Sequence, residues 1–199
     1  MRKVAVGLVV IAVGLAGAYW FVAGRGFSAR AEPTTVERVL ALRLRSLATP
    51  RDARGKRNPL PATPAMLAAG LEHFADHCAI CHGNDGSGKT PIGEGLYPKP
   101  PDLREPRTQN LADGELFYII ENGVRLTGMP AFGGPESDPN ETWPLVTFIR
   151  HLPKITPDEL ARMAQLNPKS AEELRQQQEE QEFLEGGSTP ARPKRHTHD

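Results

Sequence analysis

The chain has 199 residues, a length that favours one domain with appendages over two full domains. Its 24 basic and 24 acidic residues cancel in net charge, so the whole-chain charge identifies no partner. Only two cysteines are present, three positions apart, which excludes a small domain held together by a disulfide framework.

Residues 4–24 are almost all apolar and match the roughly 20 residues that a membrane-spanning helix needs. Tyr19, Trp20 and Phe21 near the far end resemble an interfacial aromatic belt. A secretory signal usually has a shorter apolar core, although Ala29-Arg30-Ala31 resembles a cleavage site. We expect residues 1–24 to form a transmembrane anchor or an uncleaved signal.

Residues 25–61 are predicted to be a basic linker. Residues 25–60 hold nine basic and three acidic side chains. Residues 35–48 fit a short helix with a stripe of Val36, Val39, Leu40 and Leu47, but residues 40–45 also alternate like a strand, so both structures remain open. Residues 49–61, with three prolines and several arginines, read as irregular.

Residues 62–155 mix apolar and turn residues as a globular domain does. Thr63-Pro64 predicts the start of a helix that runs straight into Cys78, and the proline-rich residues 97–103 must form a loop. Asp113 is expected to cap a helix over 114–121 that Asn122-Gly123 ends. A last core helix is expected to start near 142–144 and to carry the apolar residues Leu145, Val146, Phe148, Ile149 and Leu152.

Residues 156–199 are predicted to form a helical and then disordered tail. Two capping-box patterns, beginning at Thr156 and Ser170, each announce a helix. The second helix is too polar to bury itself, and the composition after Gly186-Gly187 indicates disorder.

The motif Cys78-Ala-Ile-Cys81-His82 carries the chemistry. Two thiols at this spacing add to the two vinyl groups on one haem edge, and the adjacent histidine then lies under the iron. A zinc site normally needs four ligands, and a thioredoxin-like dithiol needs a βαβ pattern, which this sequence lacks. We therefore expect one covalently bound haem c, which in turn requires export of the domain.

At this motif the chain resembles the class I cytochrome c family, in its membrane-anchored bacterial form, over about residues 65–152. Gly70 and Phe74 match the family's contact between the first and last core helices, with Leu145 and Phe148 as the partners. The resemblance implies an all-α fold of three to four core helices around one covalent haem, with an N-terminal transmembrane helix and a polar helical tail.

The same resemblance implies the iron ligands. His82 fits the proximal histidine, and Met129, in a loop between a glycine and a proline, fits the methionine on the other side. The simpler alternative for any of the methionines is that it fills space in the core. Met163 lies past the expected core. Pro101 matches the proline whose carbonyl accepts a hydrogen bond from the proximal imidazole.

Other polar residues support weaker hypotheses. His73 and His77 stand four apart on one helix, and His196 and His198 lie in the tail; each pair is a weak candidate for binding metal. Arg104 and Arg107 are candidates to pair with haem propionates, although a solvated arginine is the simpler interpretation.

We expect one-electron transfer, by a free carrier or by the cytochrome subunit of a respiratory chain, and no enzymatic activity of the chain itself. The alternative is a haem enzyme or gas sensor in which Met129 is displaced. Residues 62–155 hold seven basic and twelve acidic side chains, which favours redox partners with basic docking faces. We expect no nucleic acid and no small-molecule substrate. The domain is expected on the periplasmic side of a bacterial inner membrane; the basic residues after the span oppose this orientation, but that rule weakens before a long domain.

Overall fold

The computed structural model describes residues 2–26, 28–135, 138–169 and 171–184. These residues form helices and loops and no strands, as the all-α expectation requires. The helices are α1 (Arg2–Arg25), α2 (Thr35–Ala48), α3 (Arg51–Gly55), α4 (Pro64–His73), a π-helical turn (Phe74–Cys78), α5 (Ala79–His82), α6 (Pro91–Glu94), α7 (Pro106–Gln109), α8 (Asp113–Asn122), α9 (Pro139–His151), a 3₁₀ turn (Leu152–Lys154), α10 (Pro157–Leu166) and α11 (Ala171–Leu184).

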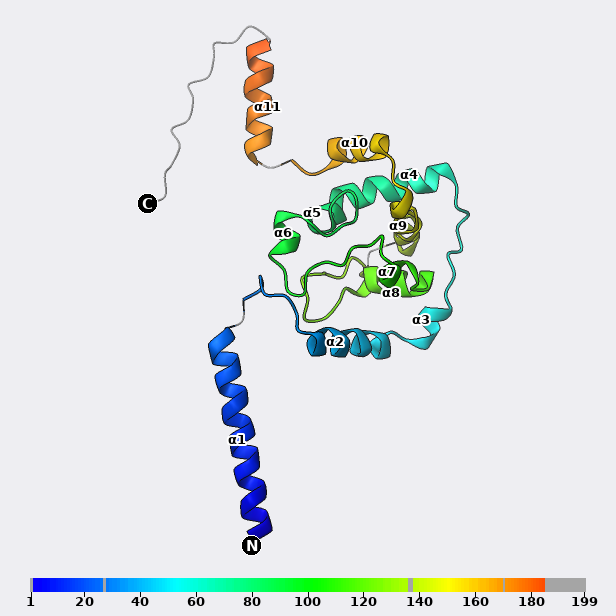
Figure 1. Ribbon diagram of the computed structural model, residues 1–199. Helices are drawn as coiled ribbons and strands as arrows, with labels where there is room; N and C mark the ends of the chain where they lie inside the picture. The colour runs from blue at the N-terminus through cyan, green and yellow to red at the C-terminus, as the bar shows by residue number, and fades with distance from the viewer. Residues whose placement is uncertain (1, 27, 136–137, 170, 185–199) are drawn as a thin grey trace.

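Helix α1 stands apart from the globular part of the molecule (Figure 1). Its 24 residues give a length of about 36 Å at 1.5 Å per residue, enough to cross the hydrocarbon core of a bilayer. Apart from Arg2 and Lys3 at its start, the segment 2–24 is almost entirely apolar, and it is not buried against the rest of the chain. This helix is long and apolar enough to cross a membrane.

The core is centred on the crossing of α4 and α9. A Cβ at Gly70 would lie 2.7 Å from the carbonyl carbon of Pro144 and 2.9 Å from Cβ of Phe148, so the glycine allows the two backbones to meet. The buried rings of Phe74 and Phe148 pack beside this crossing, with centroids 5.1 Å apart. The expected contact between the first and last core helices is confirmed, although Pro144 rather than Leu145 supplies the backbone that approaches Gly70.

Residues 49–60 lie against the domain, whereas the sequence suggested an irregular linker. They contain α3, whose Ala53 carbonyl oxygen touches Gly114 at the start of α8. Asn58 donates a hydrogen bond of 3.0 Å to Oγ1 of Thr147 on α9. The close approach at Gly114 is a long-range contact, so the local composition of residues 49–61 gave no sign of it.

Two helix starts differ from the expectation. Helix α9 begins at Pro139, earlier than residues 142–144, because Asp138 caps it by accepting from the backbone N–H of Asn140. Helix α8 begins at Asp113, which is therefore inside the helix rather than its cap; Glu115 instead accepts from the backbone N–H of Ala112, at 3.0 Å. The expected end of α8 at Gly123 is confirmed, with φ of 65°.

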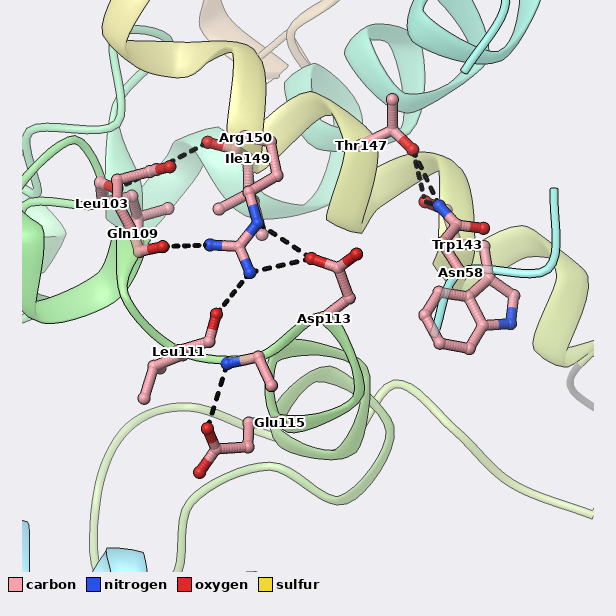
Figure 2. A network of polar contacts seen from close by, with 11 residues as sticks. Asn58, Leu103, Gln109, Leu111, Asp113, Glu115, Trp143, Thr147, Ile149 and Arg150 are labelled. Carbon is pink, nitrogen blue, oxygen red and sulfur yellow. Dashed lines mark hydrogen bonds and ion pairs between the residues drawn. The ribbon is translucent and has the colours of Figure 1, made fainter. Parts of the chain in front are cut away.

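A polar network joins α9 to the loop between α7 and α8 (Figure 2). Arg150 donates to the Asp113 carboxylate at 2.8 and 2.9 Å and to the backbone carbonyls of Gln109 and Leu111. The side-chain amide of Gln109 donates to the carbonyls of Leu103, at 2.7 Å, and Ile149, at 2.8 Å. One guanidinium thus satisfies backbone acceptors that the loop itself leaves unpaired.

Replacing Arg150 by methionine is expected to lower the free energy of unfolding by about 1–3 kcal/mol, because charge-assisted hydrogen bonds to three acceptors are lost while the aliphatic stem is kept. Arg162→Met is the matched control, since the ion pair of Arg162 with Glu72 is about half exposed and is worth about 0–1 kcal/mol. Urea titrations of both variants measure the difference. Equal losses would show that the network is no stronger than a surface pair.

Helix α10 folds back onto the domain. Its capping box is confirmed, with Thr156 and Glu159 satisfying each other's backbone N–H groups. Met163 on this helix is fully buried in the core, so its expected position past the core is wrong. His151 contacts the Glu159 carboxylate at 2.9 Å and fixes α10 to the end of α9. The capping box beginning at Ser170, like the tail after residue 184, lies outside the described residues.

The attachment of α10 is expected to weaken in acid. Burial raises the pKa of Glu159, but hydrogen bonds from His151 and Thr156 outweigh it and hold this pKa below its ordinary value of 4.5. A carboxylate with a lowered folded-state pKa stabilises the fold above its unfolded pKa, and the contribution is lost as the pH falls through the folded value. Glu159→Gln should therefore destabilise the chain at neutral pH and cost progressively less below about pH 4.5. Urea titrations across this range test it; a cost independent of pH would contradict it.

Candidate haem-binding site

The cysteines and the histidine lie at the end of one nearly continuous helical segment. The sequence predicted a helix that runs straight into Cys78. Instead, α4 ends at His73 and continues through the π-helical turn Phe74–Cys78 into α5. Such turns are frequent at functional sites because the extra residue rotates the side chains that follow. Within this turn Phe74 is buried in the core, and its ring centroid lies 6.4 Å from that of His82. The core packing thus holds the imidazole in place.

The two thiols are free and unequally buried. Burial raises the pKa of the Cys78 thiol to about 12, and burial also raises the pKa of Cys81. A dithiol that acts by thiol–disulfide exchange needs a lowered pKa on its attacking cysteine. This chemistry therefore argues against the redox dithiol, and it leaves two neutral thiols three positions apart.

His82 has the properties of a neutral ligand. Burial lowers its pKa, so the uncharged imidazole is favoured near neutral pH. Its buried Nδ1 forms no hydrogen bond of normal geometry. The Pro101 carbonyl is nevertheless close enough to raise the pKa of His82, which partly offsets the effect of burial. This arrangement fits a metal-binding imidazole, in which Nδ1 would donate a hydrogen bond to the Pro101 carbonyl while Nε2 binds the metal.

Two loops bring Pro101 to His82. The backbone N–H of Gly88 donates to the His82 carbonyl at 2.7 Å, which folds residues 83–90 around the end of α5. The backbone N–H of Leu103 donates to Gly86 at 2.8 Å and ties the proline-rich loop to this one. The expected loop over residues 97–103 is confirmed, since it holds no helix.

Arg104 stabilises the same junction. It donates to both oxygens of Asp102, at 2.9 and 2.6 Å, and bridges to Asp85 at 3.2 Å. The hydrogen bonds from Arg104 hold the pKa of Asp102 below its ordinary value. Arg104 is therefore a clamp between the two loops that surround His82, a role that the sequence analysis missed because the partner Asp85 lies 19 positions away.

Met129 lies in a loop folded back onto the end of α8. Its carbonyl accepts from the backbone N–H of Val124, at 3.2 Å, and its own N–H donates to Oγ1 of Thr127, at 3.1 Å. A Cβ at Gly123 would lie 2.6 Å from the Pro130 carbonyl carbon, so the loop depends on the glycine at that point. Gly123 and Thr127 are therefore positioning residues; the sequence indicated Gly123 only as a helix end and gave no sign of Thr127.

The Met129 loop lies close to the cysteine-bearing helix. Met129 and Cys78 are both half-buried and pack against the same core cluster. The ring of Phe132, three residues after Met129, meets the ring of His77 edge-on, with centroids 6.5 Å apart. The structure thus places the Met129 loop beside the helical segment that carries Cys78, Cys81 and His82, with Pro101 close to His82.

The residues present fit a c-type haem. The cluster offers two neutral thiols, a neutral buried imidazole with an acceptor behind its Nδ1, and a thioether in a loop whose backbone is held by hydrogen bonds. This donor set suits covalent attachment to vinyl groups and ligation of iron.

The second histidine pair does not form such a centre. The rings of His73 and His77 lie 4.9 Å apart beside a cavity of about 520 Å³ that Glu72, Asp76, Glu141 and Leu166 also line. Within the described part of the chain, no three His, Cys, Asp or Glu side chains gather closely enough to hold a metal ion. Zinc therefore gains no support here, and His196 and His198 lie outside the described residues.

Comparison with known proteins agrees with this geometry. Residues 65–149, which include the whole cluster, match the family model described as cytochrome c oxidase, cbb3-type, subunit III. Over 79 residues the chain is 35% identical to the cbb3-type cytochrome c oxidase subunit FixPc of Rhizobium leguminosarum bv. viciae. The match covers 39% of this chain and 25% of that relative, so the chain spans about a quarter of the length of the curated relative it matches.

Proposed function

From the premise that this chain is a membrane-anchored member of the cytochrome c family, we propose that it transfers one electron at a time through a single covalent haem. Cys78 and Cys81 attach the haem, and His82 and Met129 ligate its iron. The observation that carries the proposal is that the Met129 loop lies beside the helical segment that holds both thiols and the imidazole. The haem supplies a one-electron redox couple.

The residues of the chain tune and protect that couple. Met129 offers a soft thioether, which favours the ferrous state, and the apolar core around Phe74 excludes water. Pro101 orients the His82 imidazole through its carbonyl. Because His82 and Met129 would both bind the iron, no coordination position would remain for oxygen or peroxide.

We propose that the protein is the cytochrome subunit of a respiratory oxidase, or a separate electron carrier in the same respiratory chain. Both matches are to cbb3-type cytochrome c oxidase subunits, which supports a role in such a complex. The haem-binding domain is assigned to residues 62–155, with residues 25–61 before it and a tail over 156–199. We place it on the periplasmic side of a bacterial inner membrane.

The proposed partners have basic docking faces, because acidic residues outnumber basic ones in the domain. Two ion pairs join the domain to residues that precede it. Arg54 pairs with the acidic Glu115 at 3.5 Å, and Glu32 pairs with the basic Lys99. One pair neutralises an acidic residue of the domain and the other a basic one, so the acidic excess of the domain is unchanged.

Carbon monoxide tests the function. The reduced wild-type chain is expected not to bind it at concentrations that saturate an open haem, because Met129 fills the position that the gas needs. The absorption spectrum of the ferrous protein, recorded before and after addition of the gas, measures binding. Ready binding would contradict an electron carrier and favour a haem enzyme or gas sensor.

A further inference from the structure

The sequence left open whether residues 35–48 form a helix or a strand, and they form helix α2. This helix carries an apolar face that points away from the domain. Val36, Leu40, Leu44 and Leu47 follow the spacing of one helix face, and their exposed fractions are 76%, 56%, 55% and 82%. A single exposed leucine is normal on a protein surface, but a contiguous apolar stripe indicates a site of interaction. We propose that α2 lies on the surface of an anionic bilayer, with this stripe in the headgroup region.

The opposite face of α2 is held by the domain. Leu42 and Arg45 on that face are half-buried, and the pKa of Arg45 is lowered by this burial and by Arg107 nearby. The side chain of Tyr97 hydrogen-bonds to Glu37 in the first turn. The helix is therefore fixed with its apolar stripe outward, and the domain itself cannot cover that stripe.

The membrane is close to this face. Helix α1 ends at Arg25 and α2 begins at Thr35, so only nine residues separate the anchor from the stripe. In Figure 1, α2 lies along the side of the domain from which α1 extends. An amphipathic helix on that side of the domain can lie in the membrane interface with its apolar face in the headgroup region.

The charges on this side suit anionic headgroups. Arg43 on α2 and Arg51 at the start of α3 are exposed, and neither forms an ion pair with the described residues. Arg43 is placed at the edge of the apolar stripe, where its stem can remain in the apolar region while its guanidinium reaches the phosphates. A protein partner would leave the continuity with α1 unexplained, so we favour lipid.

Nitroxide labels on the full chain test the proposal. A cysteine is introduced at Leu44 on the stripe, at Val13 in α1 as the lipid reference, or at Asp158 on α10 as the water reference. The haem-bound chain without an added cysteine shows whether Cys78 and Cys81 take up label. Each labelled chain is placed in vesicles of phosphatidylcholine and phosphatidylglycerol, and collisions with oxygen and with a water-soluble nickel complex are measured.

We expect oxygen collisions to exceed nickel collisions at position 44, by a smaller ratio than at position 13 because the headgroup region is shallower than the bilayer centre, and we expect the label at 44 to become shallower still in pure phosphatidylcholine. Leu40→Gln with Leu47→Gln, which keeps helix propensity, should move the label at position 44 into water. A label at 44 that behaves like 158, or that neither reagent reaches, would overturn the proposal in favour of a free or a protein-covered face. Equal depth in both lipids would overturn the anionic part. These outcomes do not depend on electron transfer.

Discussion

Alanine at position 129 is expected to open the iron to external ligands. The thioether is the ligand proposed to exclude them, and alanine has no group that reaches the metal. The reduced Met129→Ala chain should therefore bind carbon monoxide readily. Its reduction potential should also fall by on the order of 0.1 V or more, since axial ligands set haem potentials over about 0.8 V.

Met163→Leu is the matched control for this experiment. Met163 is fully buried in the core on α10, and leucine conserves its volume. Redox titration and carbon monoxide spectra of this variant should match the wild type. If Met129→Ala binds no more carbon monoxide than Met163→Leu does, the iron takes its second ligand from elsewhere and the assignment of Met129 fails.

Alanine at position 70 is expected to cause the largest loss of stability. The new Cβ would overlap the Pro144 carbonyl group and crowd Cβ of Phe148, and neither a backbone group nor a Cβ can rotate away. Helices α4 and α9 must separate, which loosens the packing of Phe74 against Phe148. We expect the free energy of unfolding to fall by about 3 kcal/mol, at the upper end of overpacking costs.

Gly55→Ala provides the comparison, because a Cβ at that position meets nothing within 4 Å. Urea unfolding followed by circular dichroism should place Gly55→Ala near the wild type and Gly70→Ala far below it. Similar midpoints for the two variants would show that α4 and α9 can part without cost, contrary to the packing described.

Local signals predicted the parts of the fold that local interactions determine. Thr63 caps α4 and Thr156 caps α10, as expected, because each cap is completed within three residues. The apolar pattern of α2 fitted a helix and a strand equally well. No residue of this helix is fully buried, so its sequence does not carry the regular pattern that a buried helix face requires. The capping box at Thr34 and Glu37 was present in the sequence and decides in favour of the helix.

Long-range contacts account for what the sequence did not predict. Met163 is buried only because α10 folds back, and Arg150 reaches Asp113 across 37 positions. The π-helical turn before Cys78 has no sequence signature, although it sets the direction of both thiols and of His82. The site residues themselves were readable because the thiols and imidazole are adjacent; the clamp formed by Arg104 was not.

Covalent attachment of haem is the claim on which the proposed function depends. The full chain, purified from cells that mature c-type cytochromes, is denatured and extracted with acidified organic solvent, and its intact mass is measured. We predict that one haem per chain stays with the polypeptide, and that Cys78→Ala with Cys81→Ala removes it. A mass equal to that of the bare polypeptide, or complete extraction of haem from the wild type, would contradict the assignment.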